Sequence, residues 1–400
     1  MEQIVSADAI LASNTSSLSI SRIASACKLP QRCAGLHFFN PVPLMRVVEV
    51  VGGVRTSRQV VETLVSMVRQ IGHTPIVGTD TPGFIVNHLG RGLYTEGLRV
   101  VQERIAPPFI VDRILRETCG FRMGPFELLD LTGLDVSFPV MEQIYRQFYE
   151  EPRFRPSPLA ARQVAAGLFG RKTDEGFYEY REGQKVEPEV TGFAAEVSDR
   201  PIWIGPGEQK ARSLITRILG TAGVRLNESE TPGAVDACIL LPIGTDATTA
   251  AIRAKIDARR TVAIDPLFIS DKHLTVMPTP VTESGITAFI AHAMQNAGVT
   301  ASLVQDSPGF IAQRVVATIV NIACDAAQQQ IASPSDIDTG ARLGLGYPTG
   351  PLAWGDLVGA GTVLDILDQL HQFYGDPRYR ASPWLRRRAM LNLSLVHEAA

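Results

Sequence analysis

The stretch GLHFFNPVPLMRVVEV, residues 35–50, joins two strand-like apolar segments through a proline-containing turn. His37, Asn40 and Glu49 are the side chains in it that stand out from these apolar and turn-forming surroundings. Burying an imidazole, an amide and a carboxylate in strand sequence costs free energy unless the groups satisfy one another. The three residues therefore form either a structural hydrogen-bond network or a catalytic one.

The residues around this stretch predict an α/β layer. Apolar segments at residues 9–12, 34–39 and 47–51 predict short strands. Apolar residues then recur at helical spacing from Val60 to Ile71. Strands and helices in alternation are typical of an α/β fold.

A mainly helical region is predicted to follow. The motif DTPGF, residues 80–84, offers a capping side chain and a proline for the first turn of a helix. Helical patterning continues to about residue 166, whereas residues 181–200 are charged and poor in pattern. We expect that last stretch to be a linker.

The composition indicates a globular protein and argues against several classes. Of the 400 residues, 45% are hydrophobic and 20% are charged, and the formal net charge is -3. This balance gives no basic surface for nucleic acid. The first residues do not resemble a signal peptide. The sequence contains no run of about 18 apolar residues, the length that a membrane-spanning helix needs. The five cysteines lack disulfide or metal-site spacing, so we expect a cytoplasmic protein without a metal.

An internal repeat with an offset of 226 residues covers about 80 residues of the helical region. DTPGFIVN at 80–87 recurs as DSPGFIAQ at 306–313, and MGPFELLD at 123–130 recurs as TGPLAWGD at 349–356. After a slip of one residue, FYEEPRFRPSP from Phe148 recurs as FYGDPRYRASP from Phe373. Because order and spacing are kept, we predict a duplicated helical domain.

A second, smaller α/β unit is predicted between the two copies. Apolar runs at 202–204, 237–241 and 262–264 predict its strands. The sequence Gly205-Pro-Gly207 after the first run could begin a dinucleotide-binding loop, but the third glycine of such a loop is missing. A tight turn between a strand and a helix is the favoured interpretation.

Motifs in residues 1–180 resemble those of bacterial 3-hydroxyacyl-CoA dehydrogenases. They are, in order, NTSSL at 14–18, GLHFFNPVP at 35–43, VVEV at 47–50, DTPGFIVN at 80–87, MGPFELLDLTGLD at 123–135 and GRKTDEGFYEY at 170–180. The later half resembles the extra region of longer family members, in which a reduced Rossmann-like unit and a second helical domain follow the first pair.

The resemblance and the repeat together predict an α/β region followed by an all-α region, with the pair then repeated in degenerate form. We expect the C-terminal remnant of an NAD-binding Rossmann domain at 1–79, a helical dehydrogenase domain at 80–180, a linker at 181–200, a reduced Rossmann-like domain at 201–300 and a second, degenerate helical domain at 301–400.

The resemblance implies NAD-dependent oxidation of an L-3-hydroxyacyl-CoA to the 3-ketoacyl-CoA, in fatty-acid β-oxidation or aromatic-acid breakdown. An imidazole accepts a hydroxyl proton well near neutral pH, and a carboxylate partner fixes its tautomer. By their positions in the family motifs, the implied roles are general base for His37, its partner for Glu49, substrate binding for Ser16, Asn40 and Asn87, and NAD contact for Asn14 and Ser16.

Each of these residues, taken alone, also has a structural interpretation. His37 would then be a satisfied strand histidine, and Glu49 a carboxylate on a strand surface. Ser16 and Asn87 would be a turn hydroxyl and a helix amide. The charged run at Arg171 and Lys172 could meet a CoA tail, although exposure to solvent is favoured. The agreement of five positions with one motif set favours function.

The chain also departs from the family pattern. No GxGxxG loop precedes Ala9, so we expect a truncated chain that lacks most of the NAD-binding domain. The alternative function is a catalytically incomplete fragment or a non-enzymatic acyl-CoA-binding or oligomerising module. In the second copy Gln313 replaces Asn87, and the segment from His273 has no HFFN motif. We expect this copy to be architectural, pairing with the first as an internal pseudo-dimer, and a homo-oligomer is possible.

Overall fold

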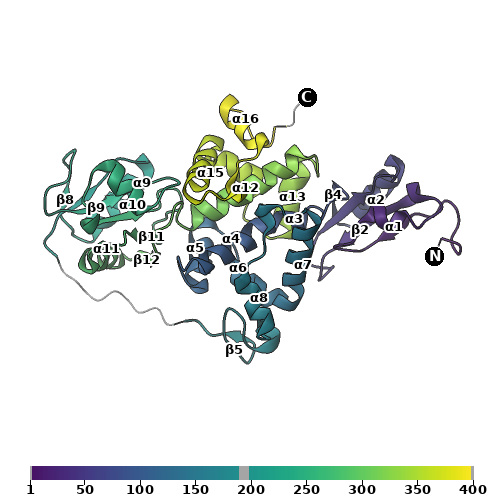
Figure 1. The fold of residues 1–400 in the computed structure, drawn as a ribbon, viewed down its shortest axis with the longest axis horizontal. Helices are drawn as coiled ribbons and strands as arrows, with labels where there is room; N and C mark the ends of the chain where they lie inside the picture. Colours follow the sequence, from purple (N-terminus) through teal and green to yellow (C-terminus); the bar gives the residue numbers. More distant parts are fainter. Residues whose placement is uncertain (1, 189–197, 398–400) are drawn as a thin grey trace.

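The computed structural model describes residues 2–188 and 198–397. A central body of helices separates two α/β lobes (Figure 1). The N-terminal sheet, drawn in purple, lies at one end, and the sheet formed by residues of the 200–300 region lies at the other. Helices from both halves of the chain build the centre.

The first sheet has the strand order β1-β2-β3-β4. Its strands are β1 (Leu11–Ser13), β2 (Cys33–Phe38), β3 (Val47–Gly52) and β4 (Thr74–Thr79). The pairs β1–β2 and β3–β4 are parallel, whereas β2–β3 is antiparallel. The predicted strands thus exist, with ends shifted by one or two residues. Helices α1 (Ile20–Ala24) and α2 (Arg58–Gln70) belong to this lobe, and the Ser57 side chain caps α2.

The turn after β4 differs from the prediction that a helix begins at Pro82. Gly83 and Phe84 have φ values of 75° and 47°, in the left-handed region that an α-helix cannot use. The Asp80 carboxylate accepts hydrogen bonds from the backbone of α1 and does not cap its own segment. The next helix, α3 (Val86–Leu89), therefore starts after the turn.

The first set of helices follows this turn, as the pattern to residue 166 predicts. It comprises α3, α4 (Arg91–Gln102), α5 (Pro108–Cys119), α6 (Pro125–Thr132), α7 (Leu134–Gln147) and α8 (Pro158–Ala165). A hairpin of β5 (Tyr180–Arg181) and β6 (Gln184–Lys185) comes next. The predicted linker thus begins with a hairpin, and its residues 189–197 lie outside the described residues.

The second sheet has the order β12-β11-β10-β9-β7-β8. Its strands are β7 (Ile202–Ile204), β8 (Leu226–Asn227), β9 (Ala237–Leu240), β10 (Thr261–Ile264), β11 (His273–Pro278) and β12 (Thr300–Leu303), with helices α9 (Gln209–Thr221), α10 (Ala247–Ala254) and α11 (Ser284–Asn296). Gly205-Pro-Gly207 forms a short turn from β7 to α9, which Glu208 caps. The favoured interpretation of this sequence is confirmed.

Four strands of this sheet repeat the pairing pattern of the first sheet. The pairs β9–β10, β10–β11 and β11–β12 are parallel, antiparallel and parallel. By this pattern the counterpart of β2 is β10, and the counterpart of β3 is β11, which begins at His273. The expectation that the segment from His273 corresponds to the HFFN segment was therefore wrong, because His273 begins the counterpart of β3 and not that of β2.

The second set of helices comprises α12 (Ala312–Gln328), α13 (Pro334–Gly344), α14 (Pro351–Val358), α15 (Ala360–Tyr374) and α16 (Pro383–Leu391). Its hydrogen bonds repeat those of the first set at the same sequence offset. Asp112 accepts from the backbone N–H groups of Phe126 and Glu127. Asp338 accepts from those of Leu352 and Ala353, each 226 residues further on.

The two sets contact each other through reciprocal hydrogen bonds. The Thr79 N–H donates to the Ile331 carbonyl at 2.9 Å, and the Gln305 N–H donates to the Ile105 carbonyl at 2.8 Å. Helices α4 and α12 pack together at the centre, so closely that a Cβ on Gly92 would lie 2.9 Å from Cα of Ile319. One hydrophobic cluster includes residues of both sets.

Three further observations concern the described part of the chain. None of its helices is long and apolar enough to cross a membrane. All five cysteines are free thiols, and four of them are buried. Among residues 2–188 and 198–397, no group of three or more His, Cys, Asp or Glu side chains is arranged to hold a metal ion.

Candidate active site

His37 and Glu49 occupy directly paired positions on the antiparallel strands β2 and β3. Side chains at paired positions point to the same face of a sheet, and here His37 Nδ1 lies 2.5 Å from Glu49 Oε2. The imidazole is 6% exposed and the carboxylate 0%. The sequence pattern therefore places the two predicted groups in contact.

The second oxygen of Glu49 is held by the main chain. Glu49 Oε1 accepts hydrogen bonds from the N–H groups of Ile85 and Val86, at 2.9 and 2.8 Å. These amides lie where the left-handed turn at Phe84 leads into α3. Two fixed donors on one oxygen restrict the rotation of the carboxylate. The carboxylate is therefore a rigid acceptor for the Nδ1–H of His37.

The other ring nitrogen of His37 stays available. Within the described residues Nε2 makes no hydrogen bond, and the ring lies between Phe39, with centroids 4.4 Å apart, and Phe84, with centroids 6.0 Å apart. An imidazole that donates from Nδ1 carries its lone pair on Nε2. His37 Nε2 is thus a proton acceptor on a ring that is flanked by two aromatic side chains.

The other predicted polar residues lie on three different segments of the chain. Asn87 directly follows Val86, whose N–H binds Glu49, and it is half-buried. Ser16 lies in an exposed loop whose Asn14 accepts a hydrogen bond from the Phe38 N–H at 2.9 Å. Asn40 is exposed and precedes a cis proline. In the described part of the chain, no hydrogen bond engages the Ser16 hydroxyl or the Asn40 and Asn87 side-chain amides.

Three residues that hold the Ser16 loop were not predicted. Asp80 accepts hydrogen bonds from Ser19 Oγ and from two N–H groups of α1. Gln143 and Gln147 of α7 both donate to the Ser17 carbonyl, at 3.3 Å. The recurrence of Asp80 in DTPGF and DSPGF was the only sequence signal for any of them.

The carboxyl ends of β1 and β2 fit the nicotinamide end of a dinucleotide. In parallel α/β sheets such ligands bind beyond the carboxyl ends of the strands. Here that position holds residues 13–19, where the Ser16 hydroxyl is exposed and Asn14 uses its oxygen on Phe38 but leaves its NH₂ group without a partner among the described residues. The fit concerns this end alone, because the sequence contains no GxGxxG phosphate loop.

The second copy has a different set of groups at the corresponding place. Asp265, which directly follows β10, stands where His37 does, and its N–H donates to the carbonyl of Thr275 on β11. Gln313 Nε2 donates to Asp265 Oδ1 at 2.9 Å, and Gln313 Oε1 accepts from the Gly244 N–H. Burial raises the pKa of Asp265 to about 6. No imidazole–carboxylate pair stands at this place among the described residues.

The charged run at Arg171 and Lys172 has partners within the chain. Lys172 forms an ion pair with Asp135, and the Arg171 guanidinium lies over the Tyr180 ring. Both side chains keep exposed surface. These contacts explain the run without a CoA ligand.

Comparison with known protein families decides the assignment. The model for the 3-hydroxyacyl-CoA dehydrogenase NAD-binding domain matches residues 1–81, and the model for the C-terminal domain of the same family matches residues 83–180 and 309–394. The chain belongs to the 3-hydroxyacyl-CoA dehydrogenase family. The resemblance seen in the sequence is confirmed, as is NAD as the family's cofactor, and the expectation of a truncated chain finds no support in these matches.

Known proteins similar to this chain match it over different lengths. A 3-hydroxyadipyl-CoA dehydrogenase of Escherichia coli is 38% identical over 96% of this chain and 75% of its own length. Hydroxyacyl-coenzyme A dehydrogenase of pig mitochondria is 42% identical over 45% of this chain, and a probable 3-hydroxybutyryl-CoA dehydrogenase of Deinococcus radiodurans is 40% identical over 44%. The chain spans 58% and 64% of these two relatives.

A solved structure supports the fold. The crystal structure of an Escherichia coli 3-hydroxybutyryl-CoA dehydrogenase matches with a TM-score of 0.80 and 37% identity, over 96% of this chain and 75% of that one. A Rossmann-like α/β region joined to a helical dehydrogenase domain is therefore the fold class of this family member, in agreement with the coarse prediction.

Proposed function

We propose that this chain oxidises L-3-hydroxyacyl-CoA thioesters to 3-ketoacyl-CoA with NAD, with His37 as the general base. The observation that carries the proposal is the buried Glu49–His37 pair, which leaves Nε2 of the imidazole as the acceptor. The names of the relatives, which are hydroxyacyl-, hydroxybutyryl- and hydroxyadipyl-CoA dehydrogenases, agree with this substrate class.

The proton transfer follows from the geometry. As the C3–H bond of the substrate breaks, the 3-hydroxyl proton moves to His37 Nε2 and the C3–O bond becomes a carbonyl. Bound NAD supplies the hydride acceptor. The imidazolium that forms donates from Nδ1 to Glu49, whose negative charge stabilises it at 2.5 Å. The two main-chain donors on Glu49 keep this carboxylate in position.

The substrate contacts are assigned to side chains that make no hydrogen bond within residues 2–188 and 198–397. The Ser16 hydroxyl and the Asn87 amide are proposed to bind the substrate oxygen, and Asn40 the region beside the imidazole. Asn14 and Ser16 are proposed to contact NAD. Support comes from their exposed or half-buried positions and from the hydrogen bonds that join the neighbouring Asn14 to Phe38 and Val86 to Glu49.

For the rest of the chain we propose a duplication in which the second copy is architectural. The two helical sets then pair as an internal pseudo-dimer, which the reciprocal bonds of Thr79 and Gln305 support. The replacement of the imidazole–carboxylate pair by Asp265 and Thr275 supports the loss of chemistry in the second copy. We keep the predicted domains at 1–79, 80–180, 201–300 and 301–400.

The test is the absorbance of NADH during oxidation of L-3-hydroxybutyryl-CoA and reduction of acetoacetyl-CoA. The proposal predicts turnover of the L but not the D enantiomer. Binding of acetoacetyl-CoA measured by calorimetry, without any turnover, would instead support the alternative of a non-enzymatic acyl-CoA-binding module. Absence of both binding and turnover would contradict the two together.

A further inference from the structure

Asp80 joins two segments that lie about 60 residues apart in the sequence. Its Oδ1 accepts from the Ile20 N–H at 2.8 Å, and its Oδ2 accepts from the Ser21 N–H and from Ser19 Oγ, both at 2.7 Å. Hydrogen bonds to a carboxylate are stronger than those between neutral groups. One side chain thus fixes the main chain at the end of the Ser16 loop.

The turn that carries Asp80 also carries the donors to Glu49. The Ile85 and Val86 N–H groups, five and six residues after Asp80, hold Glu49 Oε1. Between Asp80 and these two amides, Gly83 and Phe84 have left-handed backbone conformations that reverse the chain. The Phe84 N–H donates to the Thr81 carbonyl at 2.9 Å. The same seven-residue turn is therefore bonded to the Ser16 loop at one end and to the Glu49–His37 pair at the other.

We infer that Asp80 is a positioning residue that sets Ser16 relative to His37. This inference rests on the proposed function of both residues. Asp80 contacts neither the imidazole nor Ser16; it acts by fixing the loop from its C-terminal end, while Asn14 fixes the other end on Phe38. Losing the carboxylate loosens the C-terminal end of the loop, which Gln143 and Gln147 still contact at Ser17, but leaves Glu49 and His37 in contact.

The second copy supplies a matched control. Asp306, 226 residues further on, accepts from the N–H groups of Ala247 and Thr248 and from Thr248 Oγ1, so it holds the start of α10 as Asp80 holds that of α1. The loop before α10 carries no counterpart of the proposed Ser16–His37 site. Asp306→Asn therefore removes an equivalent set of bonds without touching that site.

The experiment compares Asp80→Asn with Asp306→Asn, each with and without Ser16→Ala. KM and kcat are measured with acetoacetyl-CoA and NADH, and amide hydrogen exchange is followed in residues 14–19. Asp80→Asn is expected to raise KM and lower kcat, with kcat/KM down by about tenfold to a hundredfold, the scale of a misplaced contact. Ser19→Ala, which removes one of the three bonds, should have a smaller effect.

The double variants separate positioning from general damage. If Asp80 acts through Ser16, adding Ser16→Ala to Asp80→Asn lowers kcat/KM by less than about threefold, whereas its full effect persists in Asp306→Asn. Exchange in residues 14–19 should quicken in Asp80→Asn alone. Equal exchange in the two Asp variants, or a full Ser16→Ala effect in both, overturns the inference. A further outcome is that the unmodified chain shows no turnover, while amide exchange in residues 14–19 still quickens in Asp80→Asn. That result refutes the proposed function but confirms that Asp80 fixes the Ser16 loop.

Discussion

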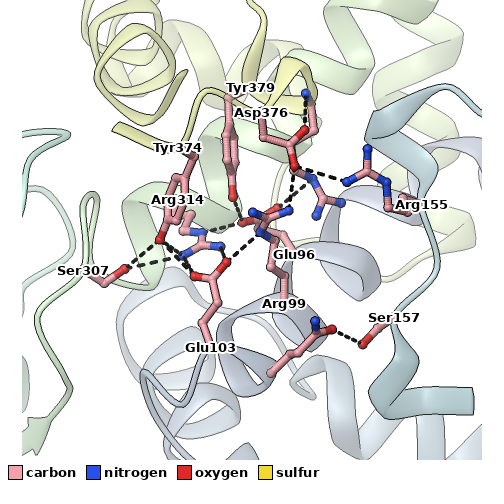
Figure 2. Close-up of polar contacts among 12 residues, drawn as sticks. Glu96, Arg99, Glu103, Arg155, Ser157, Ser307, Arg314, Tyr374, Asp376 and Tyr379 are labelled. Carbon is pink, nitrogen blue, oxygen red and sulfur yellow. Dashed lines mark hydrogen bonds and ion pairs between the residues drawn. The ribbon is translucent and has the colours of Figure 1, made fainter. Parts of the chain in front are cut away.

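The Arg314 guanidinium forms an ion pair with the Glu96 carboxylate, and neither side chain has any exposed surface (Figure 2). Arg314 also binds Glu103 at 2.8 Å, and the Tyr379 hydroxyl donates to Glu96. Burial alone would raise the pKa of Glu96, but the charges of Arg314 and Arg378 lower it overall. Since Glu96 lies on α4 and Arg314 on α12, the pair ties the two helical sets together.

Replacing Arg314 by methionine should destabilise the fold strongly. The substitution leaves Glu96 buried with only the Tyr379 hydroxyl and the more distant Arg378 as partners, a loss of about 3–5 kcal/mol for one half of a buried pair. Chemical denaturation measures the change. Arg386→Met, which breaks an exposed pair with Asp368, is the control and should cost about 1 kcal/mol or less. Equal decreases in the free energy of unfolding of the two variants would contradict the conclusion that the buried Arg314–Glu96 pair stabilises the fold.

A shortened chain that ends at residue 188 should associate with itself. It keeps the first sheet and the first set of helices but uncovers the face of α4 at Gly92, where α12 packs, and opens the hydrophobic cluster that includes residues of both sets. Exposed apolar patches of that kind drive association. Sedimentation velocity checks the prediction: association rising with concentration supports the internal pseudo-dimer, and a well-behaved monomer argues against it.

Asp265→Asn should stabilise the protein at neutral pH. Burial raises the pKa of this carboxyl from 3.8 to about 6, so its contribution to stability is fully present below about pH 3.8 and is lost as the pH rises through 6. A pKa raised from 3.8 to about 6 corresponds to a lost contribution of about 3 kcal/mol. The free energy of unfolding of the variant should thus exceed that of the unmodified chain increasingly between pH 4 and pH 7.

Comparison with Asp271→Asn isolates the effect of burial, because Asp271 is exposed. Its difference from the unmodified chain should stay near zero at each pH. A pH-independent gain for Asp265→Asn, or a matching trend in Asp271→Asn, would show that the buried charge of Asp265 is not the cause.

Local patterns were enough to predict three of the four strands of the first sheet, without β4, and the site pair. His37 and Glu49 lie on two short strands joined by a proline-containing turn, and antiparallel pairing then places the two side chains together. Helix α2 was predictable for the same reason, since its apolar spacing and Ser57 cap are local features.

Contacts between distant segments were not predictable from one sequence. The Asp80 bonds join segments about 60 residues apart, and the donors to Glu49 follow a left-handed Phe84, a conformation that a bulky residue rarely adopts. The amides that hold Glu49 are main-chain groups and leave no composition signal. The counterpart of His37 was sought on β11 because motif matching follows residue identity, whereas the sheet pairing identifies β10 and Asp265.

Glu49→Gln should lower kcat by about 10² to 10⁴ while the protein stays folded. The glutamine can still accept from the Ile85 and Val86 amides through its oxygen, but its NH₂ group then faces His37 Nδ1. The ring must accept there and carry its proton on Nε2, the wrong tautomer for a base. Steady-state rates of L-3-hydroxybutyryl-CoA oxidation with NAD, the direction in which His37 acts as the base, measure the loss. Glu62→Gln, at an exposed position on α2, should leave kcat unchanged, and unchanged kinetics for Glu49→Gln would reduce the carboxylate to a structural group.

The most direct measurement is kcat for NADH-dependent reduction of acetoacetyl-CoA by His37→Gln, beside His371→Gln at an exposed position of α15. The mechanism predicts a decrease of about 10² to 10⁴ for His37→Gln, the range for a positioned acid or base, and none for His371→Gln. A decrease of less than about threefold for His37→Gln would remove His37 from the mechanism.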